Sequence, residues 1–271
     1  MKIVRNRAFL TIGRENEVSF SGPWVDYDQL LHNIIHVPGL RGNPLRTYKS
    51  TAAGDYYPGV FQDYVASVVA SWQQKADPRL QSLGENLHQL GLTWKVEARQ
   101  TSTTDVELRV GRLQESKRGG ARDMVNIADV GFGVSQVLPV VVSLLAAQPG
   151  QLVYLEQPEI HLHPRAQVAL SELLKGAVMR GVQVVVETHS ELLLLGVQRL
   201  VAEGRLSPSK VKLHWFRRDD EGVTHISSAD LDEYGSFGEW PVDFSDVSMK
   251  AMQSYLDASL ACRHSTDCGQ G

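Results

Sequence analysis

The stretch "QLVYLEQPEIHLHP", residues 151–164, decides the fold expected for the C-terminal half of the chain. It begins as a continuous apolar run, as strands buried on both faces do, and turns polar at Glu156. Pro164 then suits the first turn of a helix. A buried strand that ends on a carboxylate and leads into a helix is one unit of an α/β sheet, and functional residues in such sheets gather at the carboxyl ends of the strands.

Similar units lie on both sides of this stretch. Upstream, "GFGVSQVLPVVVSLLAAQPG" (131–150) predicts an apolar helix that is entered through glycines. Downstream, "VQVVVETHS" (182–190) predicts a second buried strand, followed by a helix over 191–204 and a further strand in "KVKLHWFRR" (210–218). Strands that alternate with helices predict an α/β fold, with a mainly parallel sheet flanked by helices.

Residues 1–125 have a more irregular pattern, which predicts a mixed helical and β region. The segment "DYDQLLHNIIHV" (26–37) favours a helix that ends at Pro38-Gly39. The other expected elements are short strands within 1–13 and 16–22, helices over 59–74 and 78–91, and half-buried strands over 92–99 and 105–113. We therefore expect three regions: 1–125, a core over 126–217, and a C-terminal extension over 218–271 with a disordered tail.

Composition excludes several classes of protein. The net charge is −4 and the pI is near 6.1, so no bulk basic field indicates nucleic-acid binding. The longest apolar run, "VLPVVVSLLAA" (137–147), is about half a membrane span. The N-terminus lacks the apolar core of a signal peptide, and the only cysteines, Cys262 and Cys268, lie in the tail. These features predict a cytoplasmic protein without membrane segments.

Three motifs stand in one order: a glycine-rich helix entry, a strand ending in Glu-Gln-Pro-Glu, and a strand ending in Glu-Thr-His-Ser. This order resembles the C-terminal half of an ABC-type ATPase head of the OLD, RecF and SMC-like group of AAA family ATPases. In the resemblance, "DVGFGVSQVLP" (129–139) is the ABC signature, "LVYLEQPEIHLHP" (152–164) is the Walker B strand with its D-loop, and "VVVETHSE" (184–191) carries the switch histidine. "HVPGLRGNPLRTY" (36–48) and "GEWPVDFSD" (238–246) are more loosely similar.

The resemblance implies a role for each motif. Glycines let backbone N–H groups at a helix start approach a phosphate, so Gly131 and Gly133, with the hydroxyl of Ser135, would contact the γ-phosphate bound by an opposite protomer. Glu156 would hold Mg²⁺ through water, and His189 would sense the γ-phosphate. The implied cofactors are ATP and Mg²⁺. The implied partner is a second ATPase protomer or a P-loop-bearing subunit, and DNA follows from family analogy alone.

Gln157 stands where relatives carry the glutamate that polarises the attacking water. A neutral amide can orient water but cannot accept its proton. Two alternatives follow: Glu159 substitutes from the loop, or hydrolysis is slow. The resemblance thus places Gln157, Glu159 and His189 in the catalytic group.

The sequence contains no P-loop of the form G-x-x-x-x-G-K-[ST], whose glycines let backbone amides wrap phosphates. Of nine lysines, only Lys49 precedes a Ser or Thr, and Asn43 and Tyr48 stand where the glycines are needed. In the family the P-loop lies N-terminal, on the first strand of the same sheet. We therefore expect residue 1 to begin in the middle of the family's architecture and the isolated chain to be inactive as an ATPase.

Three functions stay open at this point: the C-terminal part of an ABC-type ATPase, either truncated or a split subunit; a nucleotide-independent interaction module; and a metal-dependent hydrolase. The hydrolase would use Glu156, Glu159, His161 and His163, although the resemblance makes both histidines loop and packing residues. Arg41 and Arg46 either contact a phosphate or a partner, or belong to a solvated loop. The tail "CRHSTDC" is too short to complete a tetrahedral zinc site.

Overall fold

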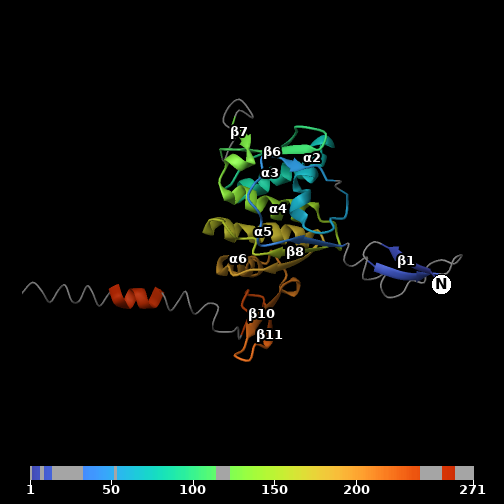
Figure 1. The fold of residues 1–271 in the computed structure, drawn as a ribbon. Helices are drawn as coiled ribbons and strands as arrows, with labels where there is room; N and C mark the ends of the chain where they lie inside the picture. The colour runs from blue at the N-terminus through green and yellow to red at the C-terminus, as the bar shows by residue number, and fades with distance from the viewer. Residues whose placement is uncertain are drawn as a thin grey trace, which may run out of the picture. The chain divides into compact units, whose positions relative to one another are not determined.

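The computed structural model describes residues 2–6, 9–13, 33–51, 54–113, 123–238 and 252–259 (Figure 1). The chain divides into two compact units, 1–188 and 189–271, and each is described by itself. The expected boundaries near 125 and 217 stay predictions. No helix among the described residues is long and apolar enough to cross a membrane.

The first unit contains a parallel sheet, drawn below α4 and α5 in Figure 1. Its strands are β3 (Ile34–Val37), β8 (Leu152–Glu156) and β9 (Gln183–Glu187), in the order β3-β8-β9. Helix α4 (Phe132–Ala146) packs on β3 and β8, and α5 (Pro164–Met179) packs on β9. The predicted α/β class with a mainly parallel sheet is confirmed.

Strand β3 corrects the helix expected over 26–37. Residues 34–37 form a strand parallel to β8, with Ile34 beside Leu152 and Val37 beside Leu155. The β-branched residues of this segment suit a strand, and Ile35 and Val37 are fully buried in it. The part of the expected helix before Asn33 lies outside the described residues.

Strands β8 and β9 are less buried than continuous apolar runs predict. On β8 only Val153 and Leu155 are buried, and on β9 every residue is at least partly exposed. Among the described strands, β9 pairs with β8 alone, so it is an edge strand of this sheet. Its exposed Val185 shows that the expectation of a strand buried on both faces was wrong for β9.

The rest of the first unit is the mixed region predicted from the sequence. An antiparallel sheet contains β4 (Tyr48–Lys49), β5 (Val96–Gln100), β6 (Asp105–Gly111) and β7 (Met124–Asn126). The remaining elements are β1 (Lys2–Asn6), β2 (Phe9–Gly13), η1 (Phe61–Tyr64), α2 (Val65–Gln74), α3 (Arg79–Gln89) and η2 (Ile127–Asp129). Helix α2 packs on β5, and both α2 and α3 pack on α4. The expected helices over 59–74 and 78–91 are therefore confirmed.

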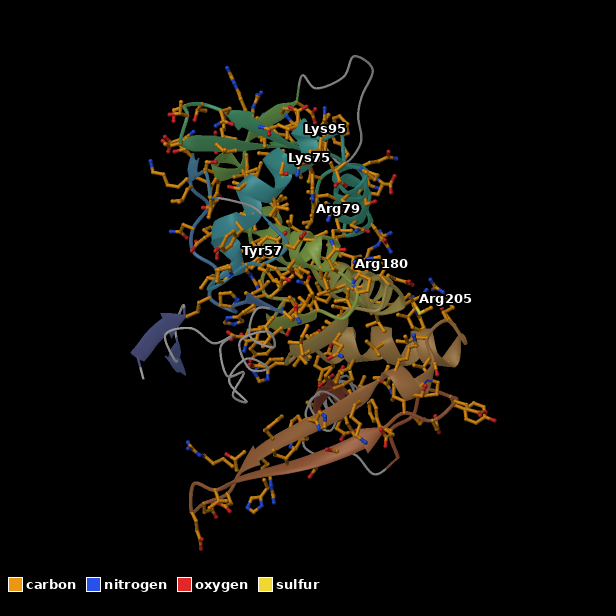
Figure 2. All side chains as sticks on the ribbon, turned by 90° about the vertical axis from the view of Figure 1, so that its right-hand side faces the viewer. Tyr57, Lys75, Arg79, Lys95, Arg180 and Arg205 are labelled. Carbon is orange, nitrogen blue, oxygen red and sulfur yellow. The ribbon has the colours of Figure 1, made fainter. Side chains whose placement is uncertain are left out.

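A charged pair fixes the turn between α2 and α3. The guanidinium of Arg79, labelled in Figure 2, donates from Nε to both carboxylate oxygens of Asp77 and from Nη2 to Oδ2, and it lies 5.0 Å from the ring centroid of Trp72. Arg180, also labelled there, donates to the carbonyl oxygens of Gly176 and Leu144 and so joins the end of α5 to α4. These contacts hold the helical layer that covers the parallel sheet.

The second unit contains α6 (Glu191–Ala202), η3 (Pro208–Lys210), β10 (Lys212–Arg218) and β11 (Thr224–Asp230). The strand expected over 210–218 does not join the parallel sheet but pairs antiparallel with β11. The turn between them explains the correction, because Gly222 has a φ of +83° and the Asp219 backbone N–H donates to the Val223 carbonyl, which reverses the chain. A short helix follows over 252–259, and most of "GEWPVDFSD" lies outside the described residues.

Candidate functional site

Glu156 ends β8, and its carboxylate is held by β3 and the segment after it. Oε1 lies 2.8 Å from Nε2 of His36, and Oε2 accepts a 3.0 Å hydrogen bond from the Gly39 backbone N–H. The Gly39 N–H and then His36 lower the pKa of Glu156, so this group is a carboxylate at neutral pH. Because a carboxylate offers about four lone-pair sites, each oxygen can still accept a water.

Side chains of all three parallel strands meet beside Glu156. The rings of His36 on β3 and Tyr154 on β8 stack, with centroids 5.2 Å apart. The Tyr154 hydroxyl donates to Oε2 of Glu187 on β9 at 3.3 Å. Burial, with the nearby carboxylates of Glu156 and Glu187, raises the pKa of Tyr154. The site is thus a row of polar side chains near the carboxyl ends of the three parallel strands.

The sequence left Arg41 as either a solvated or a phosphate-binding arginine. In the structure its side chain is a buried clamp that holds two loops together. Its side chain is only 6% exposed. Nη1 donates to the carbonyls of Pro38 and Glu156, and Nη2 donates to the carbonyl of Gln157 at 3.0 Å. Burial lowers the pKa of Arg41, and the negative charges of Glu159 and Glu156 oppose that effect. The guanidinium therefore ties the loop after β3 to the loop after β8.

The loop after β8 contains two non-glycine residues with left-handed backbone conformations. Gln157 has a φ of +43° and His161 a φ of +67°. Such conformations cost on the order of 1–3 kcal/mol and persist where the surroundings impose them. At Gln157 the constraint is visible, since its N–H donates to the Glu187 carbonyl at 2.8 Å and its carbonyl accepts from Arg41.

Glu159, the alternative base, is buried. The Thr188 hydroxyl donates to its Oε1 at 2.7 Å, and its backbone carbonyl accepts from the Leu162 N–H. At 7% exposure it does not present an open carboxylate to solvent. Glu159 is thus close to Glu156 in the sequence but lies in a different, enclosed environment.

The glycine-rich segment forms the start of α4. Gly131 precedes the helix, and a Cβ built there would meet nothing within 4 Å. A Cβ on Gly133 would lie 3.3 Å from Cδ2 of Leu92 and 3.6 Å from the carbonyl oxygen of His161. The ring of Phe132 lies 5.9 Å from that of His161. The start of α4 therefore packs against the loop after β8, which brings two of the predicted motifs together.

The hydroxyl of Ser135, which was predicted to donate a hydrogen bond to a phosphate, makes a hydrogen bond within its own helix. The Ser135 Oγ donates to the carbonyl of Phe132 at 3.0 Å. The predicted switch residue His189 is the first residue of the second unit and precedes Ser190, the N-cap of α6. Ser190 caps α6 by accepting from the Leu193 N–H at 3.0 Å. His189 is thus described with the second unit.

The residues named as ligands for a metal-dependent hydrolase do not form a metal site in the described part of the chain. Among the described residues, no three His, Cys, Asp or Glu side chains come together as a metal site. Nδ1 of His163 accepts from the Arg165 N–H and caps α5, while His161 packs near Phe132. Capping and packing are therefore the roles of these histidines.

Three residues of this site, His36, Gly39 and Gln136, were not singled out from the sequence, and Arg41 was named there without its role at the end of β8. His36, Gly39 and Arg41 contact the end of β8, and the buried Gln136 donates to the Gly42 carbonyl at 3.1 Å. The available signal was the β-branched run in "IIHV" before Pro38-Gly39, which also suits a strand whose carboxyl end would reach the same edge as Glu156.

Comparison with known families identifies the family to which the chain belongs. The family profile described as "AAA domain, putative AbiEii toxin, Type IV TA system" matches residues 34–195, more than half of the 271 residues. The chain belongs to this AAA domain family. The matched range includes β3, the clamp residue Arg41, α4, β8 and β9 of this AAA domain.

Several solved structures are similar to part of this AAA domain. One, from work on "ATP-driven dimerization and DNA stimulated activation of SMC ATPases", is 12% identical with a TM-score of 0.43, and covers 68% of this chain and 96% of that one. The Smc head domain from Pyrococcus yayanosii is 12% identical, with a TM-score of 0.43, 60% of this chain and 28% of its own covered. The SMC head from Thermotoga maritima is 13% identical, with a TM-score of 0.37, 63% and 52% covered. No curated protein sequence matches significantly.

Proposed function

We propose that this AAA domain supplies the signature, Walker B and switch elements of an ABC-type ATPase head. It acts in an ATP sandwich with a second protomer or a P-loop-bearing subunit. The observation that carries the proposal is the packing of Gly133 and Phe132 against His161, since it joins the signature-like helix start to the loop after β8 at the carboxyl edge of a parallel sheet. The family match contains both segments.

The residues present fit Mg²⁺ and ATP in part. Glu156 is ionised and keeps lone pairs for water, as a carboxylate that holds Mg²⁺ through its hydration shell requires. The space beside Gly131 would admit a phosphate next to the first N–H groups of α4. Ser135 would contact the γ-phosphate bound by the opposite protomer after releasing the Phe132 carbonyl. The sensing role of His189 stays a prediction. A cytoplasmic location and DNA as a further partner stay predictions.

The chemistry and surroundings of the two candidate bases, Gln157 and Glu159, lead us to expect slow ATP hydrolysis. Gln157 cannot accept a proton, and Glu159 is enclosed with the Thr188 hydroxyl bound to it. ATP would then act mainly as a clamp that closes the dimer. In a complex with a P-loop-bearing protein, we expect Gln157→Glu to raise the rate of ATP hydrolysis and Glu159→Gln to leave it unchanged. The opposite result would make Glu159 the base.

Nucleotide binding tests the proposal. Titration of fluorescent ATP with Mg²⁺ into the purified chain should show no saturable micromolar binding, because no P-loop pattern occurs in the sequence. With a P-loop-bearing protein that copurifies with the tagged chain, MgATP should close the complex. Gly133→Arg should block closure and leave nucleotide binding intact, while Gly176→Arg, at a position with nothing within 4 Å, should do neither. Micromolar binding by the chain alone, lost in Glu156→Ala, would contradict the proposal.

A nucleotide-independent interaction module is the second candidate. It is favoured by the contacts that already occupy Glu156 and Ser135, since His36, Gly39 and the Phe132 carbonyl give both side chains structural roles. In that case MgATP would change no complex of this chain, and Glu156→Gln would lower only the stability of the first unit. The titration above separates the two candidates.

A further inference from the structure

Strand β5 is an edge strand of the antiparallel sheet. Among the described strands it pairs with β6 alone. The Gly111 N–H donates to the Lys95 carbonyl at 3.1 Å, so Lys95 turns its backbone polar groups towards β6. In an antiparallel pair this orientation alternates along the strand. The N–H and C=O groups of Val96 and Ala98 therefore point away from the sheet.

A primary carboxamide already binds one of these outward-facing residues. Oε1 of Gln73, in α2, accepts from the Ala98 N–H at 3.0 Å, and Nε2 of the same side chain donates to the Ala98 carbonyl at 2.9 Å. Because a carboxamide carries an acceptor beside two donors, one planar group satisfies both backbone groups at once. The edge of β5 thus binds a carboxamide at Ala98.

Val96, two residues earlier, lies where the two covering helices leave the strand edge open to a cavity. A Cβ on Gly84 would lie 2.6 Å from the Trp94 carbonyl oxygen, so α3 covers the edge at Trp94. Gln73 covers it at Ala98. The cavity has a volume of about 790 Å³, and Gln73, Gly84, Trp94 and Val96 all line it. We call it the Val96 cavity.

The backbone of Val96 has unmet hydrogen-bonding capacity at this cavity. Val96 is 2% exposed, and within the part of the chain that the structure describes neither its N–H nor its C=O has a hydrogen-bond partner. Buried backbone groups without partners cost free energy, so native proteins seldom leave them unpaired. A ligand that bonds to both groups would recover this cost.

The size and walls of the Val96 cavity suit a small ring. Binding sites for small molecules have volumes of roughly 300–1,000 Å³ and mostly apolar walls. Leu80 and the indole of Trp94 supply apolar surface here. The indole is fixed in place, since its Nε1 donates to Oδ2 of Asp123 at 3.2 Å.

The charged groups around the Val96 cavity favour a neutral ligand. Lys95, labelled in Figure 2, forms an ion pair with Glu97, and Oε1 of Glu85 accepts from Nε2 of Gln81 at 2.8 Å. All four residues line the cavity. One lysine beside two glutamates gives no excess positive charge, so the lining does not attract a phosphate.

We propose that the Val96 cavity binds a small, neutral, planar molecule whose edge carries a hydrogen-bond donor beside an acceptor, as a primary carboxamide does. The acceptor binds the Val96 N–H and the donor binds the Val96 carbonyl, as Gln73 does at Ala98. An extended peptide does not fit, because α3 and Gln73 cover the edge at Trp94 and Ala98 and leave one residue open.

Two kinds of metabolite carry such an edge: ring carboxamides such as nicotinamide, and aminopurines such as adenosine, in which an amino group lies beside a ring nitrogen. The inference is independent of the proposed function. None of the signature, Walker B or switch residues lines the Val96 cavity.

An NMR titration of the purified chain, labelled with ¹⁵N-valine, tests the proposal. The Val96 amide signal is assigned by its loss in Val96→Ile, and the probes are benzamide, nicotinamide and adenosine. We expect a saturable downfield shift of this signal with benzamide, at a Kd of about 1 mM for so small a molecule. N,N-dimethylbenzamide keeps the ring and the acceptor but lacks the donor, so its Kd should be at least tenfold higher.

The two metabolite probes identify the source of the ligand. A lower Kd for nicotinamide than for adenosine supports the proposal with a ring carboxamide as the ligand, and the reverse order supports it with an aminopurine. The absence of a saturable shift with every probe would overturn the proposal. Equal affinities for benzamide and N,N-dimethylbenzamide would also overturn it, because the ring alone would then account for binding.

A variant that fills the Val96 cavity locates the binding site. Leu80→Trp places a larger side chain in the cavity and should abolish the benzamide shift. Met179→Trp is the matched control, because Met179 is 58% exposed on α5 and does not line the cavity, so its Kd for benzamide should equal that of the native chain. Native affinity in a folded Leu80→Trp chain would contradict the proposal. If Leu80→Trp does not fold, the comparison of benzamide with N,N-dimethylbenzamide on the native chain decides.

Discussion

Two arginines of one loop have opposite surroundings. Arg41 is buried and binds three backbone carbonyls, while Arg46 is largely exposed and pairs with Asp129. Removing a buried charged donor from several carbonyls costs roughly 1–3 kcal/mol or more, whereas an exposed ion pair contributes about 0–1 kcal/mol. We expect Arg41→Ala to lower the free energy of unfolding by roughly 2–4 kcal/mol and Arg46→Ala to have little effect. Urea denaturation with an unchanged m-value measures both. Similar losses would contradict the clamp.

Asp105 is one carboxylate that contributes to the pH dependence of the stability of the first unit. Hydrogen bonds from Lys49, then Ser102 and Thr104, lower its pKa from 3.8 to about 2. A group whose pKa is lower in the folded state stabilises above the unfolded value, and this stabilisation is lost as the pH falls through the folded value. Its contribution should therefore be complete above pH 4 and disappear towards pH 2.

Two variants check this pH dependence. Asp105→Asn should flatten the decrease in Tm between pH 4 and pH 2 relative to the native chain. Lys49→Met removes the first cause of the shift, so the decrease should be smaller and should end at a higher pH. Thermal unfolding followed by circular dichroism at closely spaced pH values measures both effects. Native-like pH dependence in Asp105→Asn would show that other carboxylates dominate.

At the scale of elements, two helical glycines differ in what surrounds them. A Cβ on Gly84 in α3 would lie 2.6 Å from the Trp94 carbonyl oxygen, so the helix and that backbone segment must separate. A Cβ on Gly176 in α5 would meet nothing within 4 Å. We expect Gly84→Ala to destabilise by roughly 1–3 kcal/mol, and Gly176→Ala to stabilise by about 0.5–1 kcal/mol. Chemical denaturation of both variants measures the contrast. Destabilisation by Gly176→Ala would show an unseen neighbour at α5.

The elements also show where sequence periodicity is sufficient. Helices α4 and α5 and strand β8 have long apolar patterns with clear ends, so local spacing predicts them. Strand β3 has only four residues, and its place beside β8 depends on pairing with a segment more than a hundred residues away. The partner of β10 depends on the turn at Gly222, which makes a hairpin where alternation with helices had favoured the parallel sheet.

At the scale of the whole molecule, the candidate site was predictable only along one segment. Glu156, Gln157 and Glu159 follow a recognisable strand, but His36 and Arg41 reach them from 120 and 116 residues away. No local pattern encodes that contact, since it arises from the register of parallel strands. The same distance explains why Arg41 was assigned to a loop and not to a buried clamp.

The edge strand β9 carries the last prediction. Among the described strands it pairs with β8 alone, and its Val185 is 48% exposed in an apolar run. Unpaired edges with exposed apolar residues add further strands and form open-ended assemblies. Light scattering of the purified chain on warming should show large species, and Val185→Lys should suppress them because a lysine on an edge opposes pairing. Leu195→Lys, at a similarly exposed position on α6, should not suppress them. Persistence of the large species in Val185→Lys would mean that association uses another surface.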